Sequence, residues 1–273
     1  MTTPTTDWAR LGQFWADNDL RYDEMLAPLT RRLLPAADVR PGDRVLDVGC
    51  GCGNTTRLAC RAAPEGWALG VDLSPPMIAK AALRAEEAGL GNVRHQLGDA
   101  GLEPFEQVDL VLSQLGVMFF DDPVAAFANL RRALAPGGRL VFVCWQGQEL
   151  NEARLVKRAA LAEHIAMPEP RTDGGPGPMS LAEPDRVREV LTAAGFGDVE
   201  LTDVREPLPA GSTAASAAAF AIADPTVRGL LDEAGPDTAA LAEESLRAAY
   251  APYETPEGVL LASAAWLVTA RGA

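Results

Sequence analysis

The feature that most constrains this chain is a glycine-rich turn between an apolar segment and a helical one. Residues 44–48 have the composition of a buried strand and run directly into Gly49, Gly51 and Gly53, and residues 54–63 then have a helical pattern. Glycines in such a turn reach positive φ and let the backbone approach a ligand closely. The turn therefore predicts an α/β fold with a ligand site at the carboxyl end of this strand.

The glycine spacing bears on which ligand the turn accepts. A dinucleotide-binding turn has glycine at its first, third and sixth positions. Here the glycines stand at the first, third and fifth positions, and Asn54 occupies the sixth. This spacing disfavours a dinucleotide oxidoreductase and favours a ligand without a pyrophosphate.

Short apolar segments and helical segments keep alternating as far as residue 145. Such alternation indicates a mostly parallel sheet with right-handed crossovers and helices on both faces. The predicted strands are 44–48, 68–72, 93–97, 108–113 and 139–145, and the helices between them are 54–63, 77–88 and 124–134.

The pattern changes on either side of this region. Residues 7–34 read as helix, with a kink or a new start expected at Pro28, and Pro168 to Pro178 has the composition of a mobile loop. Beyond residue 145 we expect helices at 146–167, 183–194, 213–223 and 238–250, and strands at 199–204 and 265–270.

Two carboxylates follow successive predicted strands. Asp72 ends the second strand, where a carboxylate can accept hydrogen bonds from both hydroxyls of a ribose. Asp99 ends the third strand, where it can accept a hydrogen bond from an adenine amino group. Together with the glycine turn, they predict a site for an adenosine-containing ligand.

In order and spacing these motifs resemble the class I S-adenosylmethionine-dependent methyltransferases. The resemblance is carried by Leu46 to Gly53, Gly70 to Ser74, Gly98 to Ala100, and Leu134 to Gly138, and it is good over residues 40–145. It is closest to the ubiquinone/menaquinone-methyltransferase-like group of small-molecule enzymes. It implies a Rossmann-like sheet of seven strands in the order 3-2-1-4-5-7-6, with the last strand antiparallel, and S-adenosylmethionine as the cofactor.

The resemblance also implies a role for particular residues around the cofactor. The methionine end and ribose are expected near the three loop glycines, with Asp47 orienting the ammonium group and Asp72 holding the ribose. Leu73 and Met77 are expected to pack on the adenine, and Asp99 and Ala100 to bind its edge. The remaining predicted cofactor residues are Ser113 and Gln114, at the methyl end, and Tyr22, which closes the site from the N-terminal helices.

The acceptor is less constrained, because methyl transfer is an in-line displacement that needs alignment and exclusion of water more than acid–base chemistry. By the fold, the acceptor enters at the carboxyl ends of the strands. The predicted acceptor-binding residues are Trp15, Met118, Phe119, Trp145 and Asn151. His164 is the candidate general base, whereas His95 lies within a strand and is expected to be structural.

We therefore expect methyl transfer to a small molecule, with O-methylation of an apolar specialised metabolite as the leading interpretation. C- or N-methylation, a non-methylating reaction and a catalytically silent cofactor-binding homologue remain open. The predicted organisation is one methyltransferase domain, 1–273. Its parts are an N-terminal helical lid at 1–40, a cofactor core at 41–145, cap segments at 146–182 and 207–257, and the end of the sheet at 183–206 and 258–273.

Charge and composition narrow the partners. The formal net charge is −14, and a surface this acidic repels phosphates, so nucleic acid and anionic membranes are not expected as partners. Cys50 and Cys52 lack the further ligands of a zinc site, so no metal is expected. With no visible secretory signal or membrane-spanning segment, we expect a cytoplasmic enzyme, either monomer or homodimer.

Overall fold

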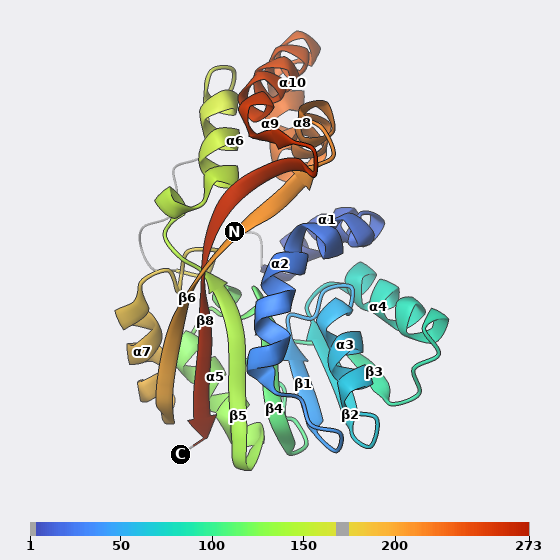
Figure 1. The fold of residues 1–273 in the computed structure, drawn as a ribbon, viewed down its shortest axis with the longest axis vertical. Coiled ribbons are helices and arrows are strands. Elements are labelled where there is room, and N and C mark those ends of the chain that lie inside the picture. Colours follow the sequence, from blue (N-terminus) through green and yellow to red (C-terminus); the bar gives the residue numbers. More distant parts are fainter. Residues whose placement is uncertain (1–3, 168–174, 273) are drawn as a thin grey trace.

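The computed structural model describes residues 4–167 and 175–272. Most of the segment 168–178 that was expected to form a mobile loop lies outside the described residues. Figure 1 shows a sheet flanked by helices, with a smaller group of helices beyond one end of the sheet. None of the described helices has the length and apolar character that crossing a membrane requires.

The central sheet has the strand order β3-β2-β1-β4-β5-β8-β6. The first five strands run parallel, whereas β8 is antiparallel to both β5 and β6. Because β7 is a two-residue strand paired only with β8, β8 is the seventh strand of the predicted order 3-2-1-4-5-7-6, which is confirmed. The strands are β1 Arg44–Val48, β2 Trp67–Asp72, β3 Val93–Leu97, β4 Val108–Gln114, β5 Leu134–Trp145, β6 Phe196–Gly211, β7 Glu254–Thr255 and β8 Gly258–Gly272.

Helices cover both faces of this sheet, as the alternating pattern predicts. On one face, Phe127 and Val190 pack into a core with strand residues such as Phe142, and on the other face Leu33 packs with Leu112. These side chains are almost fully buried, and each contributes on the order of 2 kcal/mol. The covering helices are α2 Asp19–Ala37, α3 Asn54–Ala62, α4 Pro75–Glu87, α5 Pro123–Ala133 and α7 Pro184–Ala193, and short 3-10 turns lie at Val117–Phe119, Gln148–Leu150 and Ala251–Tyr253.

The second group of helices, which we call the cap, stands on the far ends of β6 and β8. These two strands are longer than predicted and remain paired from Phe196–Gly272 to Gly211–Val259, well beyond the ends of their neighbours. The cap has a hydrophobic core of its own, which includes Leu161, Ala218 and Leu246. Its helices are α6 Glu152–Ala162, α8 Ala214–Ala223, α9 Pro225–Ala234 and α10 Pro236–Tyr250, of which α9 was not predicted.

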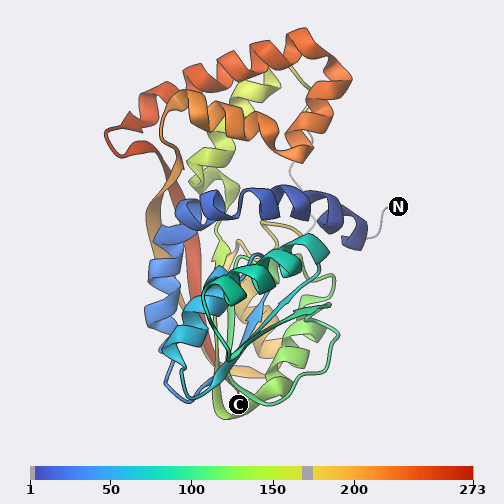
Figure 2. The same cartoon turned by 90° about the vertical axis from the view of Figure 1, so that its right-hand side faces the viewer.

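The N-terminal segment forms two helices rather than one. Helix α1 spans Pro4–Asp17 and α2 begins at Asp19, so the chain breaks at Asn18, whose side-chain amide donates to the Phe14 carbonyl at 2.8 Å. A new helix does not start at Pro28, which lies inside the continuous helix α2. Figure 2 shows α1 lying between the cap and α4, so the N-terminal helices bridge the two parts of the molecule.

Candidate functional site

The glycine turn after β1 has the backbone conformation that its sequence predicts. Gly49, Gly51 and Gly53 have φ values of 66°, 53° and 75°, in the left-handed region that favours glycine. A Cβ atom on Gly49 would lie 2.6 Å from the Cα atom of Gly116, so the two backbones touch at this point. The turn is therefore held against the loop after β4, and a side chain at position 49 would separate the two.

Asp72, at the end of β2, fixes this turn from the side. One carboxylate oxygen accepts a hydrogen bond from the Gly51 backbone N–H, and the other accepts one from the Ser74 N–H, each at 2.9 Å. Burial raises the pKa of Asp72 above its usual value. The carboxylate also lines the main cavity, and because each of its oxygens has a further lone pair, it can still accept the two ribose hydroxyls.

Asp99 and its neighbours form the next part of the same wall. One oxygen of Asp99 accepts a hydrogen bond from the Gly101 N–H at 2.8 Å, which directs the carboxylate along the loop after β3. Asp99 lines the cavity together with Ala100, Leu73 and Met77, the other residues expected at the adenine end. Two carboxylates and an apolar surface therefore meet at successive strand ends.

Three predicted cofactor residues lie behind this wall instead of in it. Asp47 is fully buried, and one of its oxygens accepts hydrogen bonds from the Thr55 and Thr56 hydroxyls, both at 2.6 Å. Ser113 donates to the Val48 carbonyl at 2.7 Å, so it braces β4 against β1. Gly53 faces Ala81 and His95 and does not line the cavity. These residues shape the turn from its far side.

The burial of Asp47 makes stability depend on pH. Burial raises the pKa of this carboxyl to about 6, above its unfolded value of 3.8, so the folded state binds the proton more tightly. The stability that protonated Asp47 contributes is therefore present below about pH 4 and lost as the pH rises to about 6.

Asp47→Asn should remove this pH dependence. When the pH rises from about 5 to about 7.5, we expect the unfolding free energy of the parent to fall by on the order of 1 kcal/mol more than that of the variant. Urea unfolding at both pH values tests this, and equal pH slopes for the two proteins would contradict it.

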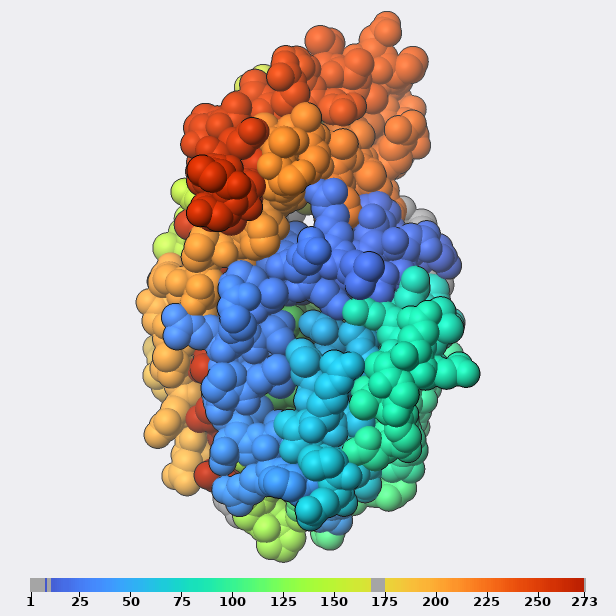
Figure 3. Space-filling model, turned by 45° about the vertical axis from the view of Figure 1, so that its right-hand side comes forward, coloured from blue at the N-terminus to red at the C-terminus, as the bar shows by residue number. Residues whose placement is uncertain are grey.

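A cavity of about 600 Å³ extends from the glycine turn to the cap. This volume lies within the range of roughly 300–1,000 Å³ that small-molecule sites occupy. Core strands, the N-terminal helices and the cap all contribute to its wall. In Figure 3 the N-terminal helices lie across the junction between the cap and the core, which places them over this cavity.

Ion pairs and hydrogen bonds hold the N-terminal helices in that position. On the core side, Arg84 of α4 lies 3.0 Å from a carboxylate oxygen of Asp19 and 2.6 Å from one of Asp23. On the cap side, the Arg21 guanidinium donates to the Ala210 carbonyl at 2.8 Å and lies 3.9 Å from the centre of the Phe220 ring. Helix α2 therefore ties the core to the cap beside the cavity.

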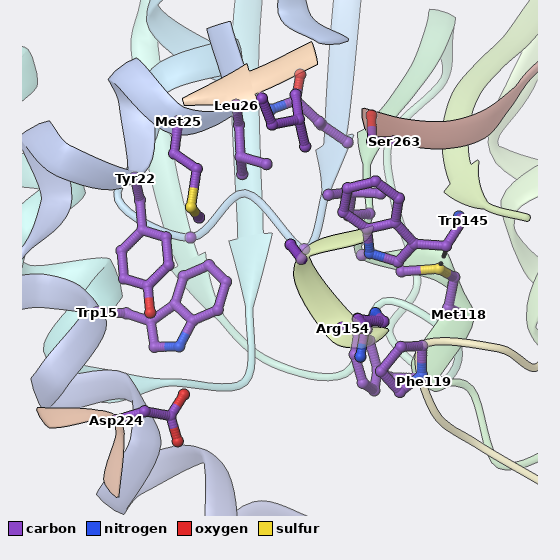
Figure 4. A pocket seen from close by; sticks show the side chains of 18 of the residues that line it. Trp15, Tyr22, Met25, Leu26, Met118, Phe119, Trp145, Arg154, Asp224 and Ser263 are labelled. Carbon is purple, nitrogen blue, oxygen red and sulfur yellow. Dashed lines mark hydrogen bonds between the residues drawn. The ribbon is translucent and has the colours of Figure 1, made fainter. Parts of the chain in front are cut away.

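Aromatic side chains cover much of the cavity between the turn and the cap. The rings of Trp15 and Tyr22 stack with their centres 3.9 Å apart, and Figure 4 shows them on one side of the cavity. Trp145, Met118 and Phe119 lie together on the other side. The five predicted acceptor residues, Trp15, Met118, Phe119, Trp145 and Asn151, all line the cavity, as do Tyr22 and Gln114.

Two of these polar residues are engaged with the protein. The Asn151 side-chain amide donates to the Gly147 carbonyl at 3.0 Å, and its oxygen accepts a hydrogen bond from the Ala264 N–H at 3.1 Å. Asn151 therefore mainly joins α6 to β8. Gln114 accepts a hydrogen bond from the Thr30 hydroxyl at 2.8 Å, which couples the end of β4 to α2.

The structure does not bring His164 to the cavity. Its Nε2 lies 2.8 Å from the Ser245 hydroxyl oxygen, in a contact between the end of α6 and α10 of the cap. Neither His164 nor His95, the only histidines of the chain, is among the described residues that line the cavity. His164 is therefore a packing residue of the cap, and we assign it no proton transfer.

Sequence reasoning missed several cavity residues from the cap. Arg154 and Lys157 of α6, and Asp224 at the start of α9, all contribute to the wall. Their contribution depends on how far β6 and β8 carry the cap over the sheet, which the sequence pattern did not reveal. One signal was available, because residues three apart on a helix share a face, and Arg154 and Lys157 have that spacing.

Comparisons with known proteins identify methyltransferases as relatives of this chain. Residues 45–138 match the family described as "Methyltransferase domain". The chain is 34% identical over 206 residues to the nocamycin O-methyltransferase of Saccharothrix syringae, and the alignment covers 71% of this chain and 72% of that protein. It is 36% identical over 122 residues to the aklanonic acid methyltransferase DauC of Streptomyces sp. (strain C5), covering 44% of this chain and 56% of that protein. The chain spans about half the length of several other curated proteins that it matches.

A solved structure shares the fold over nearly the whole chain. The phosphoethanolamine N-methyltransferase 2 of Haemonchus contortus, determined with phosphomonomethylethanolamine and S-adenosylhomocysteine, gives a TM-score of 0.60 at 17% identity. The superposition covers 99% of this chain and 60% of that one. The sheet order, the glycine turn with its two carboxylates, and the sequence identity to an O-methyltransferase over more than two thirds of both proteins lead to one conclusion: this chain belongs to the class I S-adenosylmethionine-dependent methyltransferases.

Proposed function

We propose that this enzyme transfers the methyl group of S-adenosylmethionine to an oxygen atom of an apolar small molecule bound between the core and the cap. The observation that carries the proposal is the shared cavity, which has the glycine turn and two carboxylates at one end and aromatic cap-side walls at the other. The name of the relative from Saccharothrix syringae supports oxygen as the acceptor atom.

The described residues fit this cofactor. Gly49 and Gly51 offer close backbone approach, and Asp72 and Asp99 offer carboxylates for the ribose hydroxyls and the adenine amino group. Leu73, Met77 and Ala100 supply the apolar surface for the adenine, and Tyr22 and Gln114 complete the wall. When bound, S-adenosylmethionine supplies an electrophilic methyl group on a sulfonium centre.

The chain's own contribution to the reaction is alignment and exclusion of water. The aromatic walls and the N-terminal helices remove the reacting groups from solvent, and fixed orientation of two reactants lowers a barrier by several kcal/mol. We propose that residues 1–40 form a lid, 41–145 the cofactor core, and 146–182 with 207–257 the acceptor cap of a single methyltransferase domain, whose sheet is completed by 183–206 and 258–273.

Transfer of an isotopically labelled methyl group tests the proposed reaction directly. The enzyme is incubated with labelled S-adenosylmethionine and a panel of aromatic compounds that bear hydroxyl, carboxyl, amino or only carbon nucleophiles. We expect label in hydroxyl- or carboxyl-bearing compounds, with mass-spectrometric fragmentation placing it on oxygen. Label only on nitrogen or carbon would overturn the choice of acceptor atom, and cofactor binding without any transfer would indicate a silent homologue.

Tyr22 provides a test of the lid. Tyr22→Ala removes the ring that stacks on Trp15 at the edge of the cavity, and we expect S-adenosylhomocysteine to dissociate about tenfold faster because one wall is lost. Tyr22→Phe is the matched control, since it keeps the ring and should retain nearly the parental rate. Stopped-flow displacement measures both. Parental dissociation and turnover in Tyr22→Ala would contradict a lid at the site.

A further inference from the structure

Two cationic side chains of the cap line the acceptor end of the cavity. Arg154 and Lys157 are one helical turn apart on α6, so they share a face, and both contribute to the cavity wall. Figure 4 shows Arg154 on the same side of the cavity as Phe119, Met118 and Trp145, and its central guanidinium carbon lies 6.0 Å from the centre of the Trp145 ring. A positive charge is thus presented at the aromatic part of the cavity.

Neither cation forms an ion pair with another described residue. Among the described residues, no carboxylate lies within ion-pair distance of the Arg154 guanidinium or the Lys157 ammonium. Asp224 attracts Lys157 electrostatically, but the Asp224 carboxylate caps α9 by accepting hydrogen bonds from the Thr226 and Val227 N–H groups. Burial lowers the pKa of both cations, because loss of hydration disfavours their charged forms.

Such an arrangement is costly unless an anion completes it. Both side chains are half-buried, so they lose part of their hydration without gaining a partner, and a bound anion reduces that cost. Two cations without a carboxylate partner are unusual in this chain, which has 38 acidic and 24 basic residues. Elsewhere, Arg84 and Arg139 each have a carboxylate beside them. The unpaired positive charge is therefore a property of the cavity and not of the overall composition.

We propose that the acceptor is an apolar, carboxylate-bearing small molecule whose acidic group is held by Arg154 and Lys157. This inference rests on the proposed function, because it names the class of molecule that occupies the acceptor end of the same cavity. The planar guanidinium can hold a carboxylate through two parallel hydrogen bonds, and the ammonium adds a point charge. The rings of Trp145 and Phe119 beside Arg154 provide the surface for the apolar skeleton.

A pair of probes that differ only in charge tests this assignment. The protein is loaded with S-adenosylhomocysteine and titrated calorimetrically with 2-naphthoate and with neutral 2-naphthamide. We expect 2-naphthoate to bind at least about tenfold more tightly, the effect of a charged hydrogen bond. Arg154→Gln and Lys157→Gln should each weaken 2-naphthoate binding about tenfold and leave 2-naphthamide binding unchanged.

The matched control is Arg228→Gln on α9, which removes a positive charge from the exposed surface of the cap. It should bind both probes as the parent does. Any of three results would overturn the inference: equal affinity of the parent for the two probes, binding of neither probe, or parental 2-naphthoate binding in both α6 variants.

The affinity for S-adenosylhomocysteine shows whether a failure concerns this inference or the proposed function. If Arg154→Gln and Lys157→Gln weaken it, the cations serve the cofactor and the inference fails. If the parent does not bind it, the proposed function itself fails.

Discussion

Replacing Asp72 by alanine is expected to weaken S-adenosylhomocysteine binding by about 1.5–3 kcal/mol, which is about 10–150-fold in affinity. In the structure this carboxylate has two tasks. It lines the cavity at the place proposed for the ribose, and it accepts the Gly51 and Ser74 N–H groups that fix the glycine turn. Alanine removes both the ligand contacts and the anchor of the turn, so the loss should fall at the upper end of this range.

The matched control for Asp72 is Asp109→Ala, at the opposite end of the sheet. Asp109 also accepts a backbone hydrogen bond, from the Arg44 N–H at 2.9 Å, but it does not line the cavity. Its loss should lower stability and leave cofactor affinity intact. Calorimetry on both variants, below their melting temperatures, gives the comparison. A folded Asp72→Ala protein with parental affinity would remove Asp72 from the cofactor site.

Gly49→Ala is expected to be the most damaging single change in the turn. The added methyl group would lie 2.6 Å from the Gly116 Cα, and position 49 has a φ of 66°, which costs about 1–2 kcal/mol for a residue with a Cβ. Relief of the overlap requires the turn to move away from the loop after β4, at a further cost of about 1–3 kcal/mol. Because a displacement of this kind misaligns the reactants, we expect turnover to fall about 100-fold as well.

Gly137→Ala separates the two causes of that damage. Gly137 has a φ of 78°, but its added Cβ would meet nothing within 4 Å, so only the conformational cost applies. We expect Gly137→Ala to lose about 1–2 kcal/mol of stability and to keep parental turnover. Chemical unfolding and methyl-transfer assays measure both variants. Equal losses in the two proteins would show that contact between Gly49 and Gly116 has no special role.

The sequence predicted those strands and helices that have a clear hydrophobic pattern within their own residues. Alternation of short apolar strands and helices was enough for β1 to β5, and the family resemblance supplied the order of the last two strands. The length of β6 was missed because Pro207 and Pro209 are typical of a strand's end. In the structure β6 is the outer strand of the sheet, where proline is tolerated, so pairing with β8 continues to Gly211. Helix α9 did have a local signal, since Asp224 and Pro225 form a typical helix start.

The same distinction applies to the candidate site: residues marked by a local motif could be predicted, and residues placed by tertiary structure could not. Asp72, Asp99 and the turn could be predicted because strand ends of a parallel sheet meet at one edge. The resemblance assigned Asp47 and Ser113 to the cofactor, but Asp47 is bonded to helix α3 and Ser113 to β1, and motif order does not specify those partners. The spacing of Arg154 and Lys157 indicates a shared helix face, but it does not place that face or Asp224 at the cavity, because this depends on tertiary docking of the cap.

One calorimetric experiment tests the central claim that the turn, Asp72 and Asp99 form an S-adenosylmethionine site. The unmodified protein is titrated separately with S-adenosylhomocysteine and with NAD, which share an adenosine but differ at the pyrophosphate. The glycine spacing, with Asn54 at the sixth position, predicts saturable binding of S-adenosylhomocysteine at one site per chain and no binding of NAD. Binding of NAD without binding of S-adenosylhomocysteine would contradict the account.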